Sequence, residues 1–138
     1  MLVVHCSATE GGKDFGRADI DRWHKERGFD RIGYHYVIRL SGDVEKGRAE
    51  REMGAHAAGH NARSIGICLI GGLDGMGRPS ATFTIKQFAA LESLLLDLRS
   101  RYPKAQILGH RDLPKVAKDC PCFNVRTWCA NRGLIAAP

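Results

Sequence analysis

Residues 109–122 contain imidazole, lysine and thiol side chains within one short segment, whose sequence is G-H-R-D-L-P-K-V-A-K-D-C-P-C. A catalytic zinc ion typically takes three protein ligands, often imidazole and thiolate, and leaves a fourth position open. His110 and Cys120 offer two such groups, so the third must come from a distant part of the chain. His5 is the best candidate because it lies in V-V-H-C-S-A-T, an apolar run that breaks into small polar residues as a buried strand does at its end.

The pair His110 and Cys120 does not establish a metal site by itself. A histidine and a cysteine at this spacing also occur by chance, and a buried cysteine usually behaves as a small hydrophobic residue. Cys122 also competes with Cys120 as a thiol ligand. The residues alone therefore leave a structural role open for this segment.

The composition is that of an ordinary globular protein of 138 residues, with 43% hydrophobic and 26% charged residues. A chain of this length fits one domain, which can bury roughly two-thirds of its unfolded surface in a single core. No apolar run approaches the ~18 residues of a membrane span, so we expect no membrane segment. The net charge of +6 favours polyanionic partners, such as nucleic acid, anionic lipid or an acidic cell-wall polymer, without choosing among them.

The cysteines and the N-terminal sequence bear on the cellular compartment. The chain has five cysteines, an odd number, and Met1 leads directly into a predicted strand without the features of a secretory signal. We therefore expect reduced thiols instead of a disulfide framework, and synthesis that ends in the cytoplasm.

Five short segments have the composition of β-strands. They are apolar or rich in β-branched and aromatic residues, and turn-forming residues separate them. The second and third indicate a hairpin, and the fourth, a continuous apolar run ended by a glycine pair, indicates a central strand. The segments are residues 2–6, 34–40, 44–48, 65–70 and 106–109.

Three further segments predict helices. The first spans residues 17–27, with Gly28 placed to end it, and Asn124 caps the last. A capping box of Thr84 and Gln87 opens the longest helix. Its predicted apolar face comprises Phe88, Leu91, Leu94, Leu95, Leu98 and Tyr102. Together the elements predict an α/β fold, one domain over residues 1–138 with a central mixed β-sheet flanked by helices.

The chain also resembles a known family. Seven motifs spanning nearly the whole sequence are similar to those of the zinc-dependent N-acetylmuramoyl-L-alanine amidases, in the branch that holds small phage lysozymes with amidase chemistry and the related peptidoglycan-recognition proteins. The motifs are H-C-S-A-T at His5, I-D-R-W-H-K-E at Ile20, G-Y-H-Y at Gly33, G-A-H-A-A-G-H-N at Gly54, S-I-G-I-C-L-I-G-G at Ser64, G-H-R-D at Gly109 and K-D-C-P at Lys118.

The resemblance implies an N-acetylmuramoyl-L-alanine amidase-like fold and a zinc ion held by His5, His110 and Cys120. Zinc bound by two imidazoles and a thiolate activates water and polarises a carbonyl, which suffices to hydrolyse an amide. The K-D-C-P motif favours Cys120 over Cys122 as the thiolate. Some relatives that lack this thiol only bind peptidoglycan, so its presence here favours an enzyme.

The same resemblance implies roles for four more residues. Lys118 is expected to stabilise negative charge on the attacked carbonyl oxygen, and Tyr34 to position water or pass a proton. His56 and Asn61 lie among small residues that suggest a cleft wall, and they are expected to bind substrate. The structural alternatives are a solvated surface lysine and a packing tyrosine.

Other residues capable of chemistry are expected to be structural. His24 lies on the apolar side of a predicted helix, and strand alternation turns His35 away from Tyr34 into the core. Asp112 either supports His110 or caps a turn. No carboxylate emerges from the sequence as a general base.

These expectations combine into one functional hypothesis. The chain is expected to hydrolyse the amide bond between N-acetylmuramic acid and the first L-alanine of the peptidoglycan stem peptide. The expected setting is phage or prophage lysis, with a monomer that is made in the cytoplasm and reaches the wall after holin-type release.

Two alternatives remain at the level of sequence. One is a non-catalytic peptidoglycan-recognition module, against which Cys120 and Lys118 argue. The other is a regulator of a phage RNA polymerase; a close relative with that role has an N-terminal arm before its first strand, whereas Met1 here starts at the strand. Nucleic acid is not expected as a partner.

Overall fold

The structure is a computed structural model that describes residues 1–134. Residues 135–138, the end of the predicted single domain, lie outside the described part. The elements in chain order are β1 (Leu2–Cys6), β2 (Thr9–Glu10), α1 (Arg17–Glu26), β3 (Tyr36–Ile38), β4 (Val44–Lys46), the 3-10 turn η1 (Asn61–Arg63), β5 (Ile65–Leu69), β6 (Gly72–Leu73), α2 (Ile85–Arg101), β7 (Ile107–Gly109), the 3-10 turn η2 (His110–Asp112) and α3 (Val125–Asn131).

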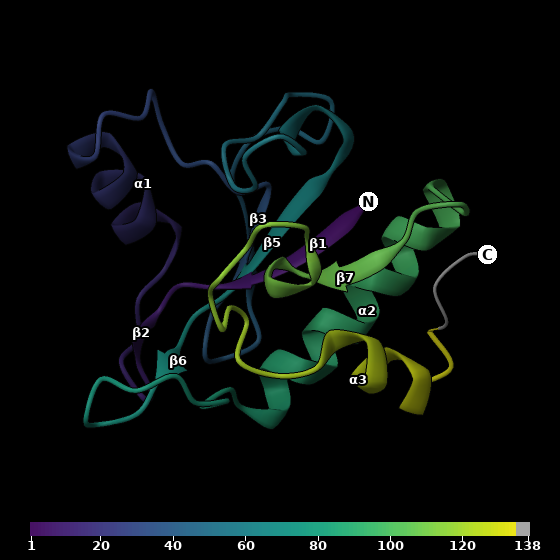
Figure 1. Ribbon diagram of the computed structural model, residues 1–138. Helices are drawn as coiled ribbons and strands as arrows, with labels where there is room; N and C mark the ends of the chain where they lie inside the picture. The colour runs from purple at the N-terminus through teal and green to yellow at the C-terminus, as the bar shows by residue number, and fades with distance from the viewer. Residues whose placement is uncertain (135–138) are drawn as a thin grey trace.

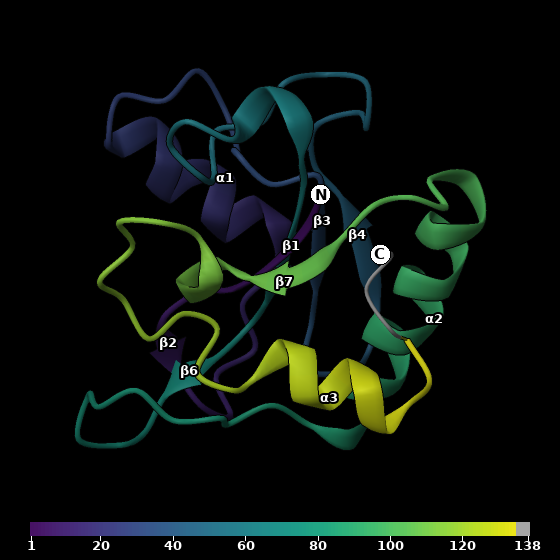
Figure 2. The same cartoon turned by 45° about the vertical axis from the view of Figure 1, so that its right-hand side comes forward.

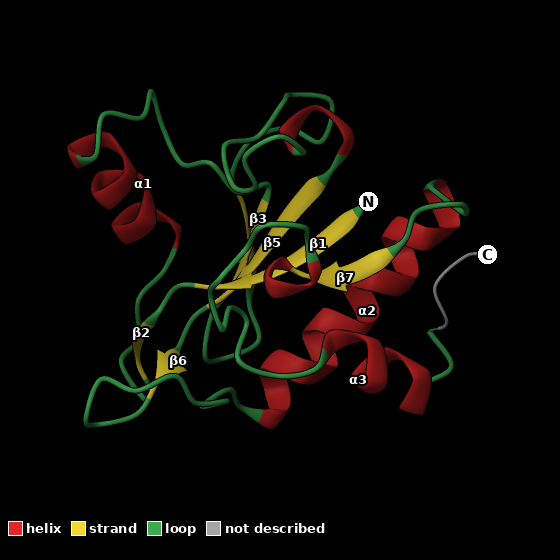
Figure 3. Ribbon diagram, in the orientation of Figure 1, coloured by secondary structure: helices red, strands yellow, loops and turns green. Residues whose placement is uncertain are grey.

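A mixed five-stranded sheet forms the centre of the molecule (Figures 1 and 3). Its strand order is β4-β3-β5-β1-β7, in which only the hairpin strand β4 runs antiparallel to its neighbour. Every residue of β1 and β5 is buried, as the two continuous apolar runs predict for strands covered on both faces. The expected mixed sheet and the hairpin are therefore confirmed.

Helices α2 and α3 cover one face of the sheet, and α1 lies on the other side (Figure 2). The main core lies between the sheet and α2, where Leu91, Leu95 and Leu98 are completely buried. The predicted apolar face of α2 is wrong at one position. Tyr102 is 40% exposed because the helix ends at Arg101 and the chain then leaves the helical path.

The opposite face carries two smaller clusters that leave room for a site between them. Near α1 the core is built around Ile20 and Val37, and near β7 around Val3 and Leu108. Because side chains alternate along a strand, His5 points to the same face as Val3. The loops above this face connect β4 to β5 and β7 to α3 (Figure 3).

The predicted elements differ from the observed ones mainly in short segments. The strand expected from residue 34 begins at Tyr36, and the glycine-rich loop after β5 contributes β6, which pairs with β2 in a separate two-stranded sheet. Within residues 1–134, no helix is long and apolar enough to cross a membrane.

Candidate metal centre

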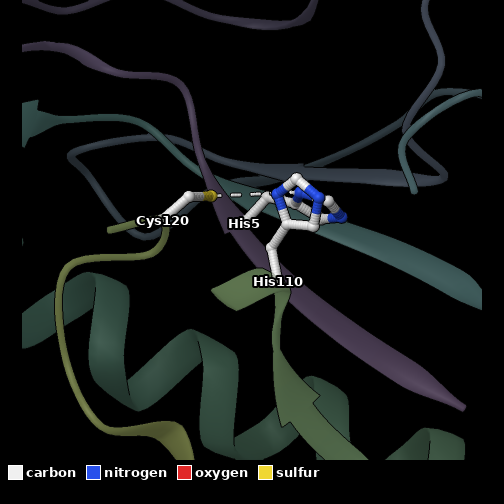
Figure 4. A group of neighbouring side chains, drawn as sticks. All are labelled: His5, His110 and Cys120. Carbon is white, nitrogen blue, oxygen red and sulfur yellow. Dashed lines mark hydrogen bonds between the residues drawn. The ribbon is translucent and has the colours of Figure 1, made fainter. Parts of the chain in front are cut away.

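Three potential metal donors converge at one end of the central strands (Figure 4). His5, His110 and Cys120 each offer one donor atom, and these atoms lie within 4.8 Å of one another. His5 comes from β1, His110 from the turn after β7, and Cys120 from the loop before α3. The structure therefore brings the three predicted donors together, and their role as metal ligands stays a prediction.

The strand register explains how two distant histidines meet. β1 and β7 are parallel neighbours in which Val4 lies opposite Gly109, so the residues that follow, His5 and His110, emerge side by side. Their ring centroids are 4.5 Å apart. The amide of Arg111 donates to the carbonyl of Cys120 at 2.8 Å, which fixes the returning loop beside the strand ends.

The imidazole of His5 is 1% exposed, and both of its nitrogens face polar partners. Nδ1 lies 4.0 Å from Cys120 Sγ, and Nε2 lies 2.8 Å from His56 Nδ1. Burial, followed by the nearby His56, His110 and Lys118, holds the pKa of His5 well below its usual value. Burial and Lys118 also lower the pKa of His110. Both rings are therefore neutral near pH 7, as metal ligands must be.

The sulfur of Cys120 is oriented toward His5 by the backbone. The amide of Cys6 donates to Cys120 Sγ at 3.2 Å, which fixes the position of the sulfur beside β1. The 4.0 Å between Cys120 Sγ and His5 Nδ1 is within the roughly 4.3 Å that a Zn–S and a Zn–N bond span together. Two imidazoles and one thiolate form a donor set that suits zinc.

The rival cysteine has a different environment. The thiol of Cys122 donates to the carbonyl of Gly72 at 3.3 Å and lies 4.0 Å from Cys6 Sγ. Burial raises the pKa of Cys122 to about 11, so this thiol stays protonated. The geometry therefore favours Cys120 as the sulfur donor.

A cleft of about 1010 Å³ opens beside the three donors. Tyr34 and Lys118 both line it, together with the small residues of the loop before η1. The Tyr34 ring centroid is 5.1 Å from that of His5. Burial raises the pKa of Tyr34 well above its usual value, so its hydroxyl remains a hydrogen-bond donor. Lys118 is exposed at the cleft and free to approach a bound molecule.

Comparison with known proteins adds to this geometry. A family model described as N-acetylmuramoyl-L-alanine amidase matches residues 1–123. The chain belongs to the N-acetylmuramoyl-L-alanine amidase family. It is 44% identical to an endolysin of Enterobacteria phage K11 over 137 residues, which is 99% of this chain and 89% of that protein. It is 40% identical to an endolysin of Escherichia phage T7 over 136 residues, again covering 99% of this chain and 89% of the relative.

Solved structures agree with the family assignment. The N-acetylmuramoyl-L-alanine amidase LysC from Clostridium intestinale superposes with a TM-score of 0.80 at 30% identity, covering 96% of this chain and 84% of that one. Drosophila PGRP-LB superposes with a TM-score of 0.78 at 24% identity over 98% of this chain and 81% of that one, which shows a shared fold. The predicted amidase-like α/β fold is therefore confirmed.

In this amidase, the two predicted substrate-binding residues lie in the cleft wall. Asn61 Oδ1 accepts hydrogen bonds from the amides of His56 and Ala57, each at 2.8 Å. Both His56 nitrogens also have protein partners, which are His5 and Ser64 Oγ at 3.2 Å. Contact of His56 and Asn61 with substrate stays a prediction. No sequence pattern indicates the link between His5 and His56.

His24 and His35 have structural partners, as expected, and Asp112 takes the turn-capping role that was one of its two alternatives. His35 Nδ1 accepts from the amide of Gly66 at 3.0 Å, and His24 Nδ1 accepts from the amide of Gly33 at 2.9 Å. Asp112 accepts from the amide of Gly109 at 2.8 Å and so caps the turn that carries His110.

Proposed function

We propose that this chain is a zinc-dependent amidase that hydrolyses the bond between N-acetylmuramic acid and L-alanine in peptidoglycan, as an endolysin does. The observation that carries the proposal is the convergence of His5, His110 and Cys120 at one end of a large cleft. Membership of the amidase family and endolysin relatives that match 99% of the chain support it.

The three converging side chains would hold the metal. When bound, zinc acts as a Lewis acid toward a carbonyl and activates water for attack on the amide. The lowered pKa values of His5 and His110 keep both imidazoles neutral and available. The amide of Cys6 donates to the Cys120 sulfur and so holds it in place for the metal.

Tyr34 and Lys118 would act directly on the reacting groups. The exposed ammonium of Lys118 can approach the amide oxygen, where negative charge develops as water attacks. The Tyr34 hydroxyl, protonated because burial raises its pKa, can donate a hydrogen bond that orients water or substrate. The wall that contains His56 and Asn61 would contact the glycan or the stem peptide.

The endolysin relatives support a proposed biological setting in phage lysis. The protein would be made in the cytoplasm as a monomer and reach the cell wall through a lesion made by another phage protein, such as a holin. Peptidoglycan would be its partner, without a membrane or nucleic acid. Co-purification with a phage RNA polymerase would instead support the regulator alternative.

Digestion of purified peptidoglycan tests the proposal. We expect stoichiometric zinc in the protein, release of free L-alanine amino termini and no new reducing sugar ends, because the bond cut is an amide. New reducing ends would identify a glycosidase. Pelleting with insoluble peptidoglycan without any hydrolysis would identify a recognition module.

A further inference from the structure

A chain of hydrogen bonds leads away from the candidate metal centre through the protein. His5 Nε2 lies 2.8 Å from His56 Nδ1, and His56 Nε2 lies 3.2 Å from Ser64 Oγ. Ser64 Oγ in turn lies 2.8 Å from the carbonyl oxygen of His60. The chain therefore connects a buried donor of the centre to the backbone of the cleft wall.

The last group in this chain sets the direction of every bond. A backbone carbonyl can only accept, so the single hydroxyl proton of Ser64 is donated to His60. Ser64 Oγ must then accept from His56, which places the His56 proton on Nε2 and leaves Nδ1 as an acceptor. His5 consequently donates from Nε2–H, and its Nδ1 carries the lone pair. That nitrogen is the one that faces Cys120.

The His56 ring is also held by packing. A Cβ atom on Gly66 would lie 2.6 Å from the ring, and one on Gly54 would lie 2.7 Å from it, so the ring occupies a slot that only glycines leave open. Asn61 accepts from the backbone amide of His56 and fixes the start of the loop. The ring is therefore restrained by its backbone, by its neighbours and by Ser64.

We infer that His56 and Ser64 are positioning residues of the metal centre, which fix the tautomer and ring orientation of His5 so that Nδ1 points at the ion. The inference rests on the proposed function, because it concerns the ion that His5 would bind. Partners of this kind orient metal-bound histidines, and their loss typically weakens metal affinity about 10–100-fold. In this role His56 acts through His5, not on the substrate.

Zinc affinity, measured by competition with a chromogenic chelator, tests the role of each group. His56→Leu removes the acceptor and should weaken zinc binding about 10–100-fold. His56→Asn should restore most of the affinity, because its Oδ1 can accept near the former position of Nδ1. Ser64→Ala frees His56 to adopt either tautomer. It should weaken zinc binding by about 10-fold, the low end of the range expected for His56→Leu. His60→Ala is the control, since only its carbonyl takes part.

Nitrogen-15 NMR of the imidazoles in the parent protein tests the tautomers without any substitution. We expect His56 in the Nε2–H form, and a mixture of forms in Ser64→Ala. Observation of the Nδ1–H form of His56 in the parent would overturn the inference. So would parent-like zinc affinity in a folded His56→Leu protein. A parent protein that binds no zinc would instead overturn the proposed function itself.

Discussion

Two of the three proposed metal donors are restrained by hydrogen bonds to protein groups. The amide of Cys6 donates to the sulfur of Cys120, and His56 accepts from His5. These contacts hold two of the three donor groups in place within the fold. A site organised in this way loses little side-chain freedom when it binds a metal, which favours high affinity.

Cys120→Ala should remove zinc and hydrolytic activity together, because it deletes the sulfur donor. Zinc content per chain and the rate of peptidoglycan hydrolysis should both fall to background. Cys122→Ala is the matched control, since that thiol faces Gly72 and not the donors. If Cys122→Ala lost the metal and Cys120→Ala kept it, our assignment of the two cysteines would be reversed.

Lys118→Ala should keep its zinc but lower the turnover rate by about 10²-fold, because the ammonium would interact most strongly with charge that exists only in the transition state. Binding to insoluble peptidoglycan should change little. Lys104→Ala removes the same charge from an exposed position that does not line the cleft, and it should hydrolyse at the parental rate. A normal turnover rate in the Lys118→Ala protein would show that this lysine is a solvated surface residue without a role in hydrolysis.

At this scale the sequence predicted the meeting of His5, His110 and Cys120, because each stands at or beyond the end of a recognisable strand or in a distinctive motif. It did not predict the link between His5 and His56. That link depends on a slot formed by Gly54 and Gly66, which lie in different segments that only the folded chain brings together.

Among the elements, helix α2 is joined to the sheet at its first turn. The buried side-chain amide of Gln87 donates to the backbone carbonyls of Ile38 and Ile70, at 3.1 and 2.9 Å. The hydroxyl of Thr84 donates to the backbone carbonyl of Leu40 at 2.7 Å and accepts from the backbone amide of Gln87 at 3.1 Å. The side chains of this one turn therefore supply hydrogen-bond partners both to carbonyls at the strand ends and to the amides of the helix N-terminus.

Thr84→Ala should lower the free energy of unfolding by about 1–2 kcal/mol, because it removes a helix cap. Urea denaturation at neutral pH measures the difference. Thr127→Ala is the control: Thr127 is exposed in helix α3, and its loss should cost less than about 0.5 kcal/mol. Equal losses in the free energy of unfolding from the two substitutions would show that the Thr84 cap does not stabilise this fold.

The sequence predicted the long helices and strands better than the short ones. The capping box of α2 and the apolar runs of β1 and β5 carry enough residues to show a pattern. β2 and β6 have two residues each and pair through their backbones, so their side chains carry no periodic signal. Tyr102 continued the helical spacing, but its hydroxyl instead donates to Glu50 at 2.9 Å outside the helix.

Across the whole molecule, Glu50 connects the loop after the hairpin to the end of α2. Its carboxylate accepts from the hydroxyls of Tyr36 and Tyr102 and from the guanidinium of Arg101. Arg101 is the main cause that holds the pKa of Glu50 down at about 2, from an ordinary value of 4.5. Folding therefore favours the ionised carboxylate.

Because the folded pKa lies below the unfolded one, this stabilisation is present above about pH 4.5 and is lost as the pH falls toward 2. Glu50→Gln should lower the free energy of unfolding by about 1–3 kcal/mol at pH 7, and by less at pH 3. Urea titrations of both proteins at the two pH values measure this. Asp97→Asn, which removes an exposed partner of the same Arg101, should cost less than about 0.5 kcal/mol. A pH-independent loss in Glu50→Gln would contradict the proposed linkage.

Removal of the metal should affect activity far more than the fold. The main core between the sheet and α2 includes none of the three donor residues, so the metal-free protein should stay folded. Chelation should abolish hydrolysis, and added zinc should restore it.

Zinc at 1,000 times its dissociation constant should also add about 4 kcal/mol to the free energy of unfolding, because it binds only the folded site. Thermal unfolding with chelator and with zinc measures this shift, which should vanish in Cys120→Ala; a shift that persists there would mean that zinc acts elsewhere on the chain.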